Sequence, residues 1–269
     1  MEYLSDGVKL FCSVHGGDGP AVVLLHPMPC DHRFWLEAAE ALTGKYRVII
    51  PDLRGQGRSE AGEGSITMKH LATDIVHLLN ELEVQRATFA GCSIGGYAMY
   101  ELWRSFPERI QALAFCCARP QQDTEAGRAA REDWIIKVRE RGTADLVTSL
   151  LSRLIGPTAQ RRQPERIPEV RSMMQTVTPS AMIALMQGLA MRPDSVETAR
   201  SIRVPALVLA GGEDPVSTPA DMKLLAETIR NGGYSAEYTE LRDAGHFAPW
   251  EQPEMVGRLL RRFFDSVVG

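Results

Sequence analysis

Hydrophobic residues in the first 118 positions fall either into short unbroken runs or into longer stretches with a helical period. The short runs predict buried strands over residues 10–15, 21–26, 46–51, 87–90 and 110–118. Residues 68–82 carry apolar side chains at helical spacing, with Thr67 placed to cap the first turn, and a second apolar helix ends near Phe106. Because strands alternate with helices, the pattern predicts a mainly parallel sheet covered on both faces.

This alternation stops at Arg119 and resumes near Val204. The residues between them show only helical patterns, the clearest of which cover 146–155 and 182–189. We therefore expect one α/β core, made of residues 1–118 and 203–269, that carries an all-helical insertion over residues 119–202.

Composition and charge limit the classes of binding partner that we expect for this protein. A chain of 269 residues can bury a large single core, and its net charge of −4 gives no basic surface for nucleic acid. No apolar run approaches the roughly 20 residues of a membrane helix, and the N-terminus lacks a signal-peptide pattern. Five cysteines without metal-ligand spacing are typical of reduced core thiols. We expect a cytoplasmic protein without nucleic-acid or membrane partners, and either a monomer or a homodimer.

The most informative motif is Gly91-Cys92-Ser93-Ile94-Gly95, which lies between the strand 87–90 and an apolar helix. A serine flanked by glycines at a strand-to-helix turn is the arrangement called a nucleophile elbow. The sharp turn holds the hydroxyl at the edge of the sheet, and the small flanking residues let strand and helix approach each other. The motif therefore predicts a reactive serine at position 93.

Two later residues complete a candidate site. Asp214 follows the apolar strand 206–210, and His246 follows the next strand. A serine hydroxyl is a weak nucleophile unless a base within hydrogen-bonding reach takes its proton, and an imidazole is the usual base. Asp243 and Asp123 are alternative positions for the acid, but the phrase Gly-x-x-Asp directly after a strand favours Asp214.

The order Ser, Asp, His along the chain is that of α/β-hydrolases, not of chymotrypsin-like or subtilisin-like enzymes. Over nearly its whole length the sequence resembles the α/β-hydrolase superfamily, including the segments 51–59 and 245–253. The resemblance implies a doubly wound, mainly parallel sheet of eight strands. It also implies that residues 119–202, inserted after the sixth strand, form a helical cap, or lid, over the active site.

The same resemblance implies roles for individual residues. Ser93 is expected to be the nucleophile, His246 the general base and acid, and Asp214 the group that orients the imidazole. The oxyanion hole is expected from the backbone N–H groups of Ile94 and Met28. Relatives usually have glycine where this chain has Pro27, a departure that leaves the N–H of Met28 in place because only the proline lacks one.

Three further residues are candidates for substrate binding. Arg119 is placed to meet a substrate carboxylate, although a surface ion pair is the plainer interpretation. Trp134 is a candidate lining residue of an apolar acyl pocket, although aromatic residues are more often core. Met186 belongs to a methionine-rich stretch that either packs the core and cap or forms an adaptable wall for an apolar substrate.

Within the superfamily the resemblance is closest to small lid-bearing esterases and lactonases, including the enol-lactonase type. It implies hydrolysis of a small carboxylic ester, thioester or lactone through an acyl-enzyme, with no metal and no organic cofactor. Carbon–carbon bond hydrolases, cofactor-free perhydrolases and hydroxynitrile lyases share the same triad, and a slow-turnover ligand receptor of the same fold is a further alternative. A dinucleotide-binding oxidoreductase is disfavoured because its fingerprint requires glycine where Ser93 stands.

Overall fold

The computed structural model describes residues 1–268, which form a single eight-stranded sheet in the order β1-β2-β4-β3-β5-β6-β7-β8. The strands are β1 (Glu2–Ser5), β2 (Val8–His15), β3 (Ala21–Leu25), β4 (Arg47–Pro51), β5 (Ala87–Cys92), β6 (Ile110–Cys116), β7 (Ala206–Gly211) and β8 (Ala236–Leu241). The β1–β2 and β2–β4 pairs are antiparallel, and all other pairs are parallel. The predicted doubly wound, mainly parallel sheet of eight strands is confirmed.

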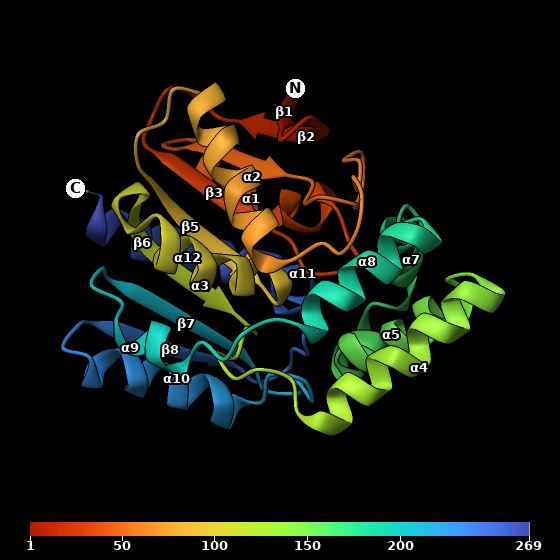
Figure 1. Cartoon of the computed structure of the whole chain (residues 1–269). Helices are drawn as coiled ribbons and strands as arrows, with labels where there is room; N and C mark the ends of the chain where they lie inside the picture. Colours follow the sequence, from red (N-terminus) through yellow and green to blue (C-terminus); the bar gives the residue numbers. More distant parts are fainter. Residues whose placement is uncertain (269) are drawn as a thin grey trace.

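Helices cover both faces of the sheet because its central strands are apolar on both sides. The helices of the α/β core are α1 (Leu36–Thr43), α2 (Met68–Glu81), α3 (Ile94–Ser105), α10 (Pro219–Asn231), α11 (Ala248–Glu251) and α12 (Pro253–Val267). Buried side chains of α2, α3 and α10 pack with one face, around Phe89 and Val208. Side chains of α1, α11 and α12 pack with the opposite face, around Leu24 and Leu209. Figure 1 shows the resulting layers.

Between β6 and β7 the described chain contains helices and no strand. These are α4 (Glu125–Arg141), α5 (Ala144–Leu154), α6 (Pro157–Arg162), α7 (Ile167–Met174), α8 (Pro179–Ala190) and α9 (Val196–Arg200), with a 3-10 turn at Pro164–Arg166. Helices α4, α5, α7 and α8 gather at one end of the sheet, apart from the helices that flank the strands, whereas α9 returns to lie beside α3 and α10 (Figure 1). We call residues 119–202 the helical insertion.

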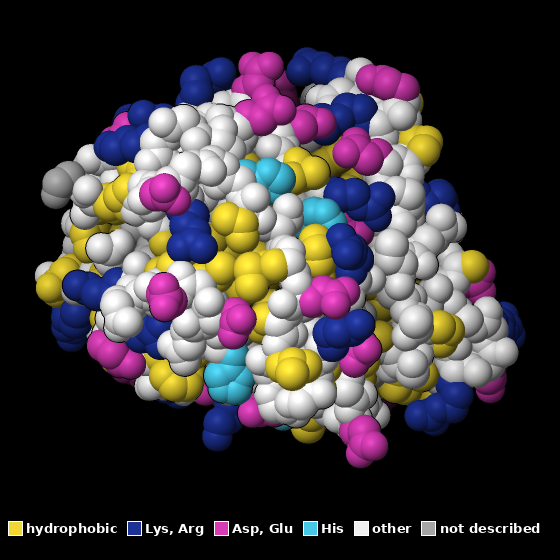
Figure 2. Space-filling model, turned by 90° about the horizontal axis from the view of Figure 1, so that it is seen from above, with side chains coloured by type: hydrophobic (Ala, Val, Ile, Leu, Met, Phe, Trp, Pro, Cys, Tyr) yellow, Lys and Arg dark blue, Asp and Glu magenta, His cyan; other side chains and the backbone are white. Residues whose placement is uncertain are grey.

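The surface carries both signs of charge. Figure 2 shows Lys and Arg side chains interspersed with Asp and Glu around a central group of apolar side chains on the face seen from above. Within residues 1–268, no helix combines the length and the apolar character needed to cross a bilayer.

The structure differs from the sequence prediction mainly at the boundaries of elements. The edge strand β1 was not predicted, because only its residues Tyr3 and Ser5 are buried. Strand β6 ends at Cys116, not at Ala118, and Cys117 has a positive φ of 50°. Cys117 is therefore part of the loop that leaves the sheet.

Candidate active site

Ser93 occupies the turn between the end of β5 and the start of α3. Its backbone has φ 50° and ψ −116°, a conformation that side-chain-bearing residues rarely adopt. The neighbours Cys92 and Ile94 are fully buried, whereas Ser93 is partly exposed. At Gly95 an added Cβ would overlap the carbonyl oxygen of Leu25, so α3 approaches β3 too closely for any larger residue. The strained turn thus leaves the side chain of Ser93 partly exposed between buried neighbours.

His246 and Asp214 form a buried pair beside this turn. The two atoms Nδ1 of His246 and Oδ2 of Asp214 are 2.8 Å apart, and the side chains are almost completely shielded from solvent. The other carboxylate oxygen accepts hydrogen bonds from the backbone N–H groups of Val216, at 2.7 Å, and Ser217, at 3.1 Å. Asp214 is fixed because both of its carboxylate oxygens are engaged. Its bond to the imidazole uses Nδ1, which leaves Nε2 available to another partner.

The loop that carries His246 lies directly against the elbow. The thiol of Cys92, the residue before Ser93, is 3.5 Å from the carbonyl oxygen of His246. Within residues 1–268, the structure records no hydrogen bond between the Ser93 hydroxyl and the imidazole. Hydrogen bonds of this kind are often long in a free enzyme and tighten when substrate binds.

The alternative acid positions have other partners. Asp243 is exposed and pairs with Arg162 at 3.1 Å. Asp123 is buried between Arg131, at 2.5 Å, and Arg192, at 3.0 Å, and these guanidinium groups hold the pKa of its carboxyl below the ordinary value despite burial. Of the three candidates, Asp214 is the one that His246 contacts.

The two expected oxyanion donors lie on the neighbouring segments. Ile94 is the first residue of α3, so its N–H has no acceptor inside the helix. Met28 lies in the loop after β3, which is held by a bond from Cys30 N–H to the Pro27 carbonyl. His26 is buried there with both ring nitrogens engaged, one with the Pro27 carbonyl and one with the N–H of Leu53. This arrangement gives His26 a structural role, and burial lowers its pKa.

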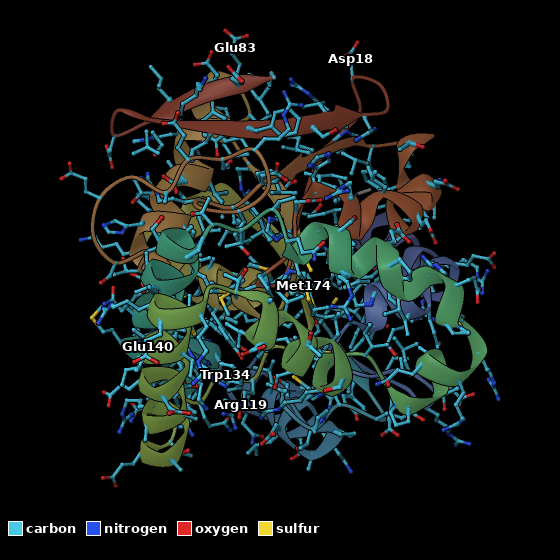
Figure 3. All side chains as sticks on the ribbon, turned by 90° about the vertical axis from the view of Figure 1, so that its right-hand side faces the viewer. Asp18, Glu83, Arg119, Trp134, Glu140 and Met174 are labelled. Carbon is cyan, nitrogen blue, oxygen red and sulfur yellow. The ribbon has the colours of Figure 1, made fainter. Side chains whose placement is uncertain are left out.

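The three candidate substrate-binding residues have different surroundings. The N–H of Arg119 contacts the hydroxyl of Ser217, in the loop that holds Asp214. The Nε of Arg119 is buried without a hydrogen-bond partner among residues 1–268. Trp134 lies on α4, half-buried, with the ammonium group of Lys137 4.8 Å from its ring centroid. Met186 lies on α8 and is almost fully buried in the core. Figure 3 shows Arg119 and Trp134 on the side of the molecule formed by the insertion.

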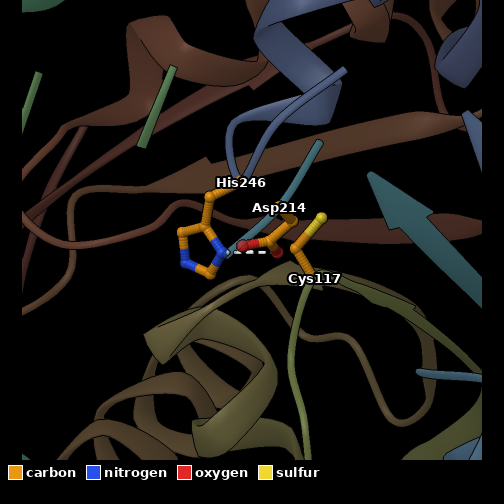
Figure 4. A group of neighbouring side chains, drawn as sticks. All are labelled: Cys117, Asp214 and His246. Atoms are coloured by element: carbon orange, nitrogen blue, oxygen red, sulfur yellow. Dashed lines mark hydrogen bonds and ion pairs between the residues drawn. The ribbon is translucent and has the colours of Figure 1, made fainter. Parts of the chain in front are cut away.

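The residues around the histidine include one set with metal-ligand chemistry. Atoms of Cys117, Asp214 and His246 lie within 4.8 Å of one another, and the three side chains come from separate segments (Figure 4). A metal would need a thiolate and a free ring nitrogen here. Burial instead raises the pKa of the Cys117 thiol well above its ordinary value, and Nδ1 of His246 is bonded to Asp214. The set suits a hydrogen-bonded pair better than a metal centre.

One polar residue next to the histidine was missed by sequence reasoning. Glu251, at the end of α11, is 2% exposed and accepts three backbone N–H bonds. The signal available in the sequence was a lone carboxylate five residues after His246, directly after the apolar segment Phe247–Trp250.

Comparison with known proteins places this geometry in a family. Residues 20–253 match the model of the alpha/beta hydrolase fold. This match spans most of the chain, so the protein belongs to the α/β-hydrolase fold family. The observed strand order and the Ser93 turn agree with that membership.

Several relatives cover nearly the whole chain. The 3-oxoadipate enol-lactonase 1 of Acinetobacter baylyi is 28% identical over 97% of this chain and 95% of its own length. Among solved structures, a thermophilic esterase from Thermogutta terrifontis, with malate bound, is 31% identical with a TM-score of 0.93, covering 99% of this chain and 98% of its own. The enol-lactonase from Burkholderia xenovorans is 27% identical with a TM-score of 0.91, covering 98% of this chain and all of its own.

Proposed function

We propose that the protein is a serine hydrolase that cleaves a small carboxylic ester, thioester or lactone through an acyl-enzyme. Relatives that cover nearly the whole chain are named enol-lactonase and esterase, which supports an enzyme acting on ester-type bonds. The observation that carries the proposal is the buried His246–Asp214 pair beside a serine held on a strained turn. These are the groups that acyl transfer requires.

The first half of the reaction transfers the acyl group to the protein. Nε2 of His246 takes the proton of the Ser93 hydroxyl as the oxygen attacks the substrate carbonyl carbon. Asp214 holds the imidazole in the tautomer with hydrogen on Nδ1 and stabilises the imidazolium that forms. The imidazolium then gives its proton to the leaving oxygen, or leaving sulfur of a thioester. In a lactone that leaving oxygen remains attached to the acyl chain.

The second half returns the enzyme to its starting state. Water attacks the ester of Ser93 while His246 takes one of its protons, and the same proton returns to the serine oxygen as the acid leaves. In both halves the negative oxygen of the tetrahedral intermediate is expected to accept hydrogen bonds from the N–H groups of Ile94 and Met28. The helical insertion is proposed to act as a cap that shields these steps from bulk water.

The substrate is proposed to carry a carboxylate. Nε of Arg119 is buried next to the loop of Asp214 and has no hydrogen-bond partner in the described part of the chain. A buried donor of this kind favours an anionic acceptor. Trp134 and Met186 are proposed to contribute to the apolar wall on the insertion side. One relative is named for an enol-lactone of 3-oxoadipate, a dicarboxylic acid, which agrees with a small anionic lactone as substrate.

The test of this function is covalent labelling combined with kinetics. A short-chain nitrophenyl ester and a small lactone should be hydrolysed by the wild-type protein, and an alkyl fluorophosphonate should add one mass increment on Ser93. Ser93→Ala should lose several orders of magnitude in kcat and all labelling while its circular dichroism is unchanged. Ser266→Ala, an exposed serine on α12, is the matched control and should keep both properties. Substrate binding without turnover or labelling would contradict the proposal and indicate a receptor.

A further inference from the structure

A buried carboxylate holds the backbone on both sides of His246. Oε2 of Glu251 accepts a hydrogen bond from the N–H of Gly245, at 2.8 Å, and Oε1 accepts one from the N–H of Phe247, at 3.1 Å. These residues directly precede and follow the histidine. A single side chain thus fixes the backbone on both sides of His246, and this backbone determines the position of the imidazole.

The same carboxylate reaches the helical insertion. Oε2 also accepts a hydrogen bond from the N–H of Gly156, at 3.0 Å, in the residue that precedes α6. An added Cβ at Gly156 would lie 2.7 Å from the N–H nitrogen of Gly245, so the insertion and the histidine loop are in direct backbone contact. The N–H of Phe247 also lies 3.2 Å from the carbonyl oxygen of Leu154, at the end of α5. The position of the insertion and the position of the histidine are therefore mechanically linked.

We propose that Glu251 is a positioning residue that sets the place of His246 and ties it to the helical insertion. This inference rests on the proposed serine-hydrolase function, because it assigns to Glu251 the task of holding the base of that reaction. A carboxylate suits the task because its two oxygens accept all three N–H bonds at once. An amide in its place has one oxygen and would point an NH₂ group at one of the three donors.

Burial of this charge is costly, which argues for a function beyond packing. Among residues 1–268 the structure records no ion pair to Glu251, so only N–H dipoles compensate its charge. Burial raises its pKa from the ordinary 4.5 to about 7, although the three N–H bonds act in the opposite direction. The titratable groups near its carboxylate are Glu213, Cys117 and His246. The charged residues that line the same pocket as Glu251 are Glu37, Glu40, Arg166, Glu254 and Arg258.

Among these neighbours, the cation Arg166 forms no ion pair with Glu251. Arg166 is held elsewhere, since it donates to Glu37 and to the carbonyl of Trp250 and stacks on the Trp250 ring. Glu213 raises the Glu251 pKa further through charge repulsion. When Glu251 binds a proton, one oxygen becomes a donor and the hold on the loop weakens. Loss of activity on the acid side should therefore involve Glu251 as well as protonation of the catalytic imidazole.

The experiment compares Glu251→Gln and Glu251→Asp with Glu213→Gln. Glu213 is the matched control, because its carboxylate also binds the insertion, at Thr158, but makes no hydrogen bond to the two N–H groups that flank His246. Glu251→Gln should lower kcat about 10- to 100-fold, the effect of a displacement near 1 Å at the reacting groups, with KM within about threefold. Glu251→Asp keeps the charge on a shorter side chain, and its kcat should lie between those of Glu251→Gln and wild type. Glu213→Gln should remain near wild type in kcat.

The pH profile is the readout that a purely structural role would not change. For wild type the acid limb of log kcat against pH should steepen toward a slope of two, because two groups must lose protons. For Glu251→Gln the slope should be one, and for Glu251→Asp it should remain above one. Unchanged kcat and slope in Glu251→Gln would overturn the proposal. Failure of both Glu251 variants to fold would also overturn it, because the residue would then serve stability alone. Activity that survives in Ser93→Ala would instead refute the proposed function itself.

Discussion

At the scale of single residues, the site depends on how firmly Asp214 is held. Both of its oxygens are already bonded, one to His246 and one to the loop N–H groups of Val216 and Ser217. In Asp214→Asn the NH₂ group would face either Nδ1–H or the backbone donors, and the imidazole would lose its required tautomer. We expect kcat to fall by about 10⁴, as with other triad acids.

This expectation is checked by steady-state kinetics with a nitrophenyl ester. Asp243→Asn is the control, since Asp243 is exposed and pairs with Arg162, away from His246. An active Asp214→Asn together with an inactive Asp243→Asn would show that the acid has been assigned to the wrong residue.

A second prediction concerns Arg119 and the choice of substrate. Arg119→Met keeps most of the apolar stem but removes the guanidinium group. For a lactone that carries a carboxylate, kcat/KM should fall about 10- to 100-fold, the range for loss of a hydrogen bond to a charged group. For a neutral nitrophenyl ester it should change little. Arg162→Met, at an exposed position, controls for the general loss of one positive charge. Equal losses for both substrates would exclude a carboxylate-specific role.

Residue chemistry was predictable from sequence where the motif is local, and not where contacts join distant segments. Ser93 and the strained turn follow from one glycine-rich stretch. Glu251 was not found, because its three donors come from residues 156, 245 and 247, which only the fold brings together. The surroundings of Arg119 were equally hidden, because Ser217 approaches it from the loop after β7.

At the scale of elements, the packing of α3 against β3 depends on Gly95. A methyl group there would overlap the Leu25 carbonyl oxygen, which belongs to a strand with neighbours on both sides and cannot move freely. Gly95→Ala should lower the free energy of unfolding by about 1–3 kcal/mol through overpacking. Urea denaturation measures this change in the free energy of unfolding. Gly44→Ala is the control, because Gly44 has a helical φ of −71° and nothing within 4 Å of an added Cβ. Equal stability of the two variants would contradict this account of the elbow.

The elements that sequence reasoning predicted well are those with strong patterns. Helix α2 begins after Thr67 as expected, and the Thr67 hydroxyl accepts a hydrogen bond from the N–H of His70. Helix α8 contains the predicted segment 182–189 and begins after Thr178, whose hydroxyl accepts a hydrogen bond from the N–H of Ala181. Helix α4 was not predicted, because its sequence is highly charged and only Val138 is fully buried. Its position follows from packing against α8, which no local pattern reveals.

At the scale of the whole molecule, buried carboxylates make stability depend on pH in two opposite directions. Asp123 has a lowered pKa in the folded protein, because Arg131 and Arg192 favour its charged form. Its contribution is present above the pKa of the unfolded chain and is lost as the pH falls through the folded value. Asp123 contacts both ends of the insertion, through Arg131 on α4 and Arg192 after α8. Acid should therefore weaken the contact between the two ends of the insertion.

Glu251 acts with the opposite sign. Its folded pKa of about 7 lies above the ordinary 4.5, so the folded state binds more protons than the unfolded state between these values. Its contribution to stability is greatest below about pH 4.5 and declines as the pH rises through 7, by about 3 kcal/mol in total at 1.4 kcal/mol per pKa unit. The free energy of unfolding of wild type minus that of Glu251→Gln should therefore fall from pH 5 to pH 8.

Urea denaturation at several pH values measures both effects, and the two variants serve as controls for each other. The corresponding difference for Asp123→Asn should grow from pH 3 to pH 6, because there the unfolded chain binds the extra proton. A flat difference for Glu251→Gln would mean that the carboxylate titrates near its ordinary pKa because the N–H bonds balance the effect of burial. In that case the acid limb of log kcat against pH should have a slope of one, because only one group titrates there. The urea and kinetic measurements must therefore agree.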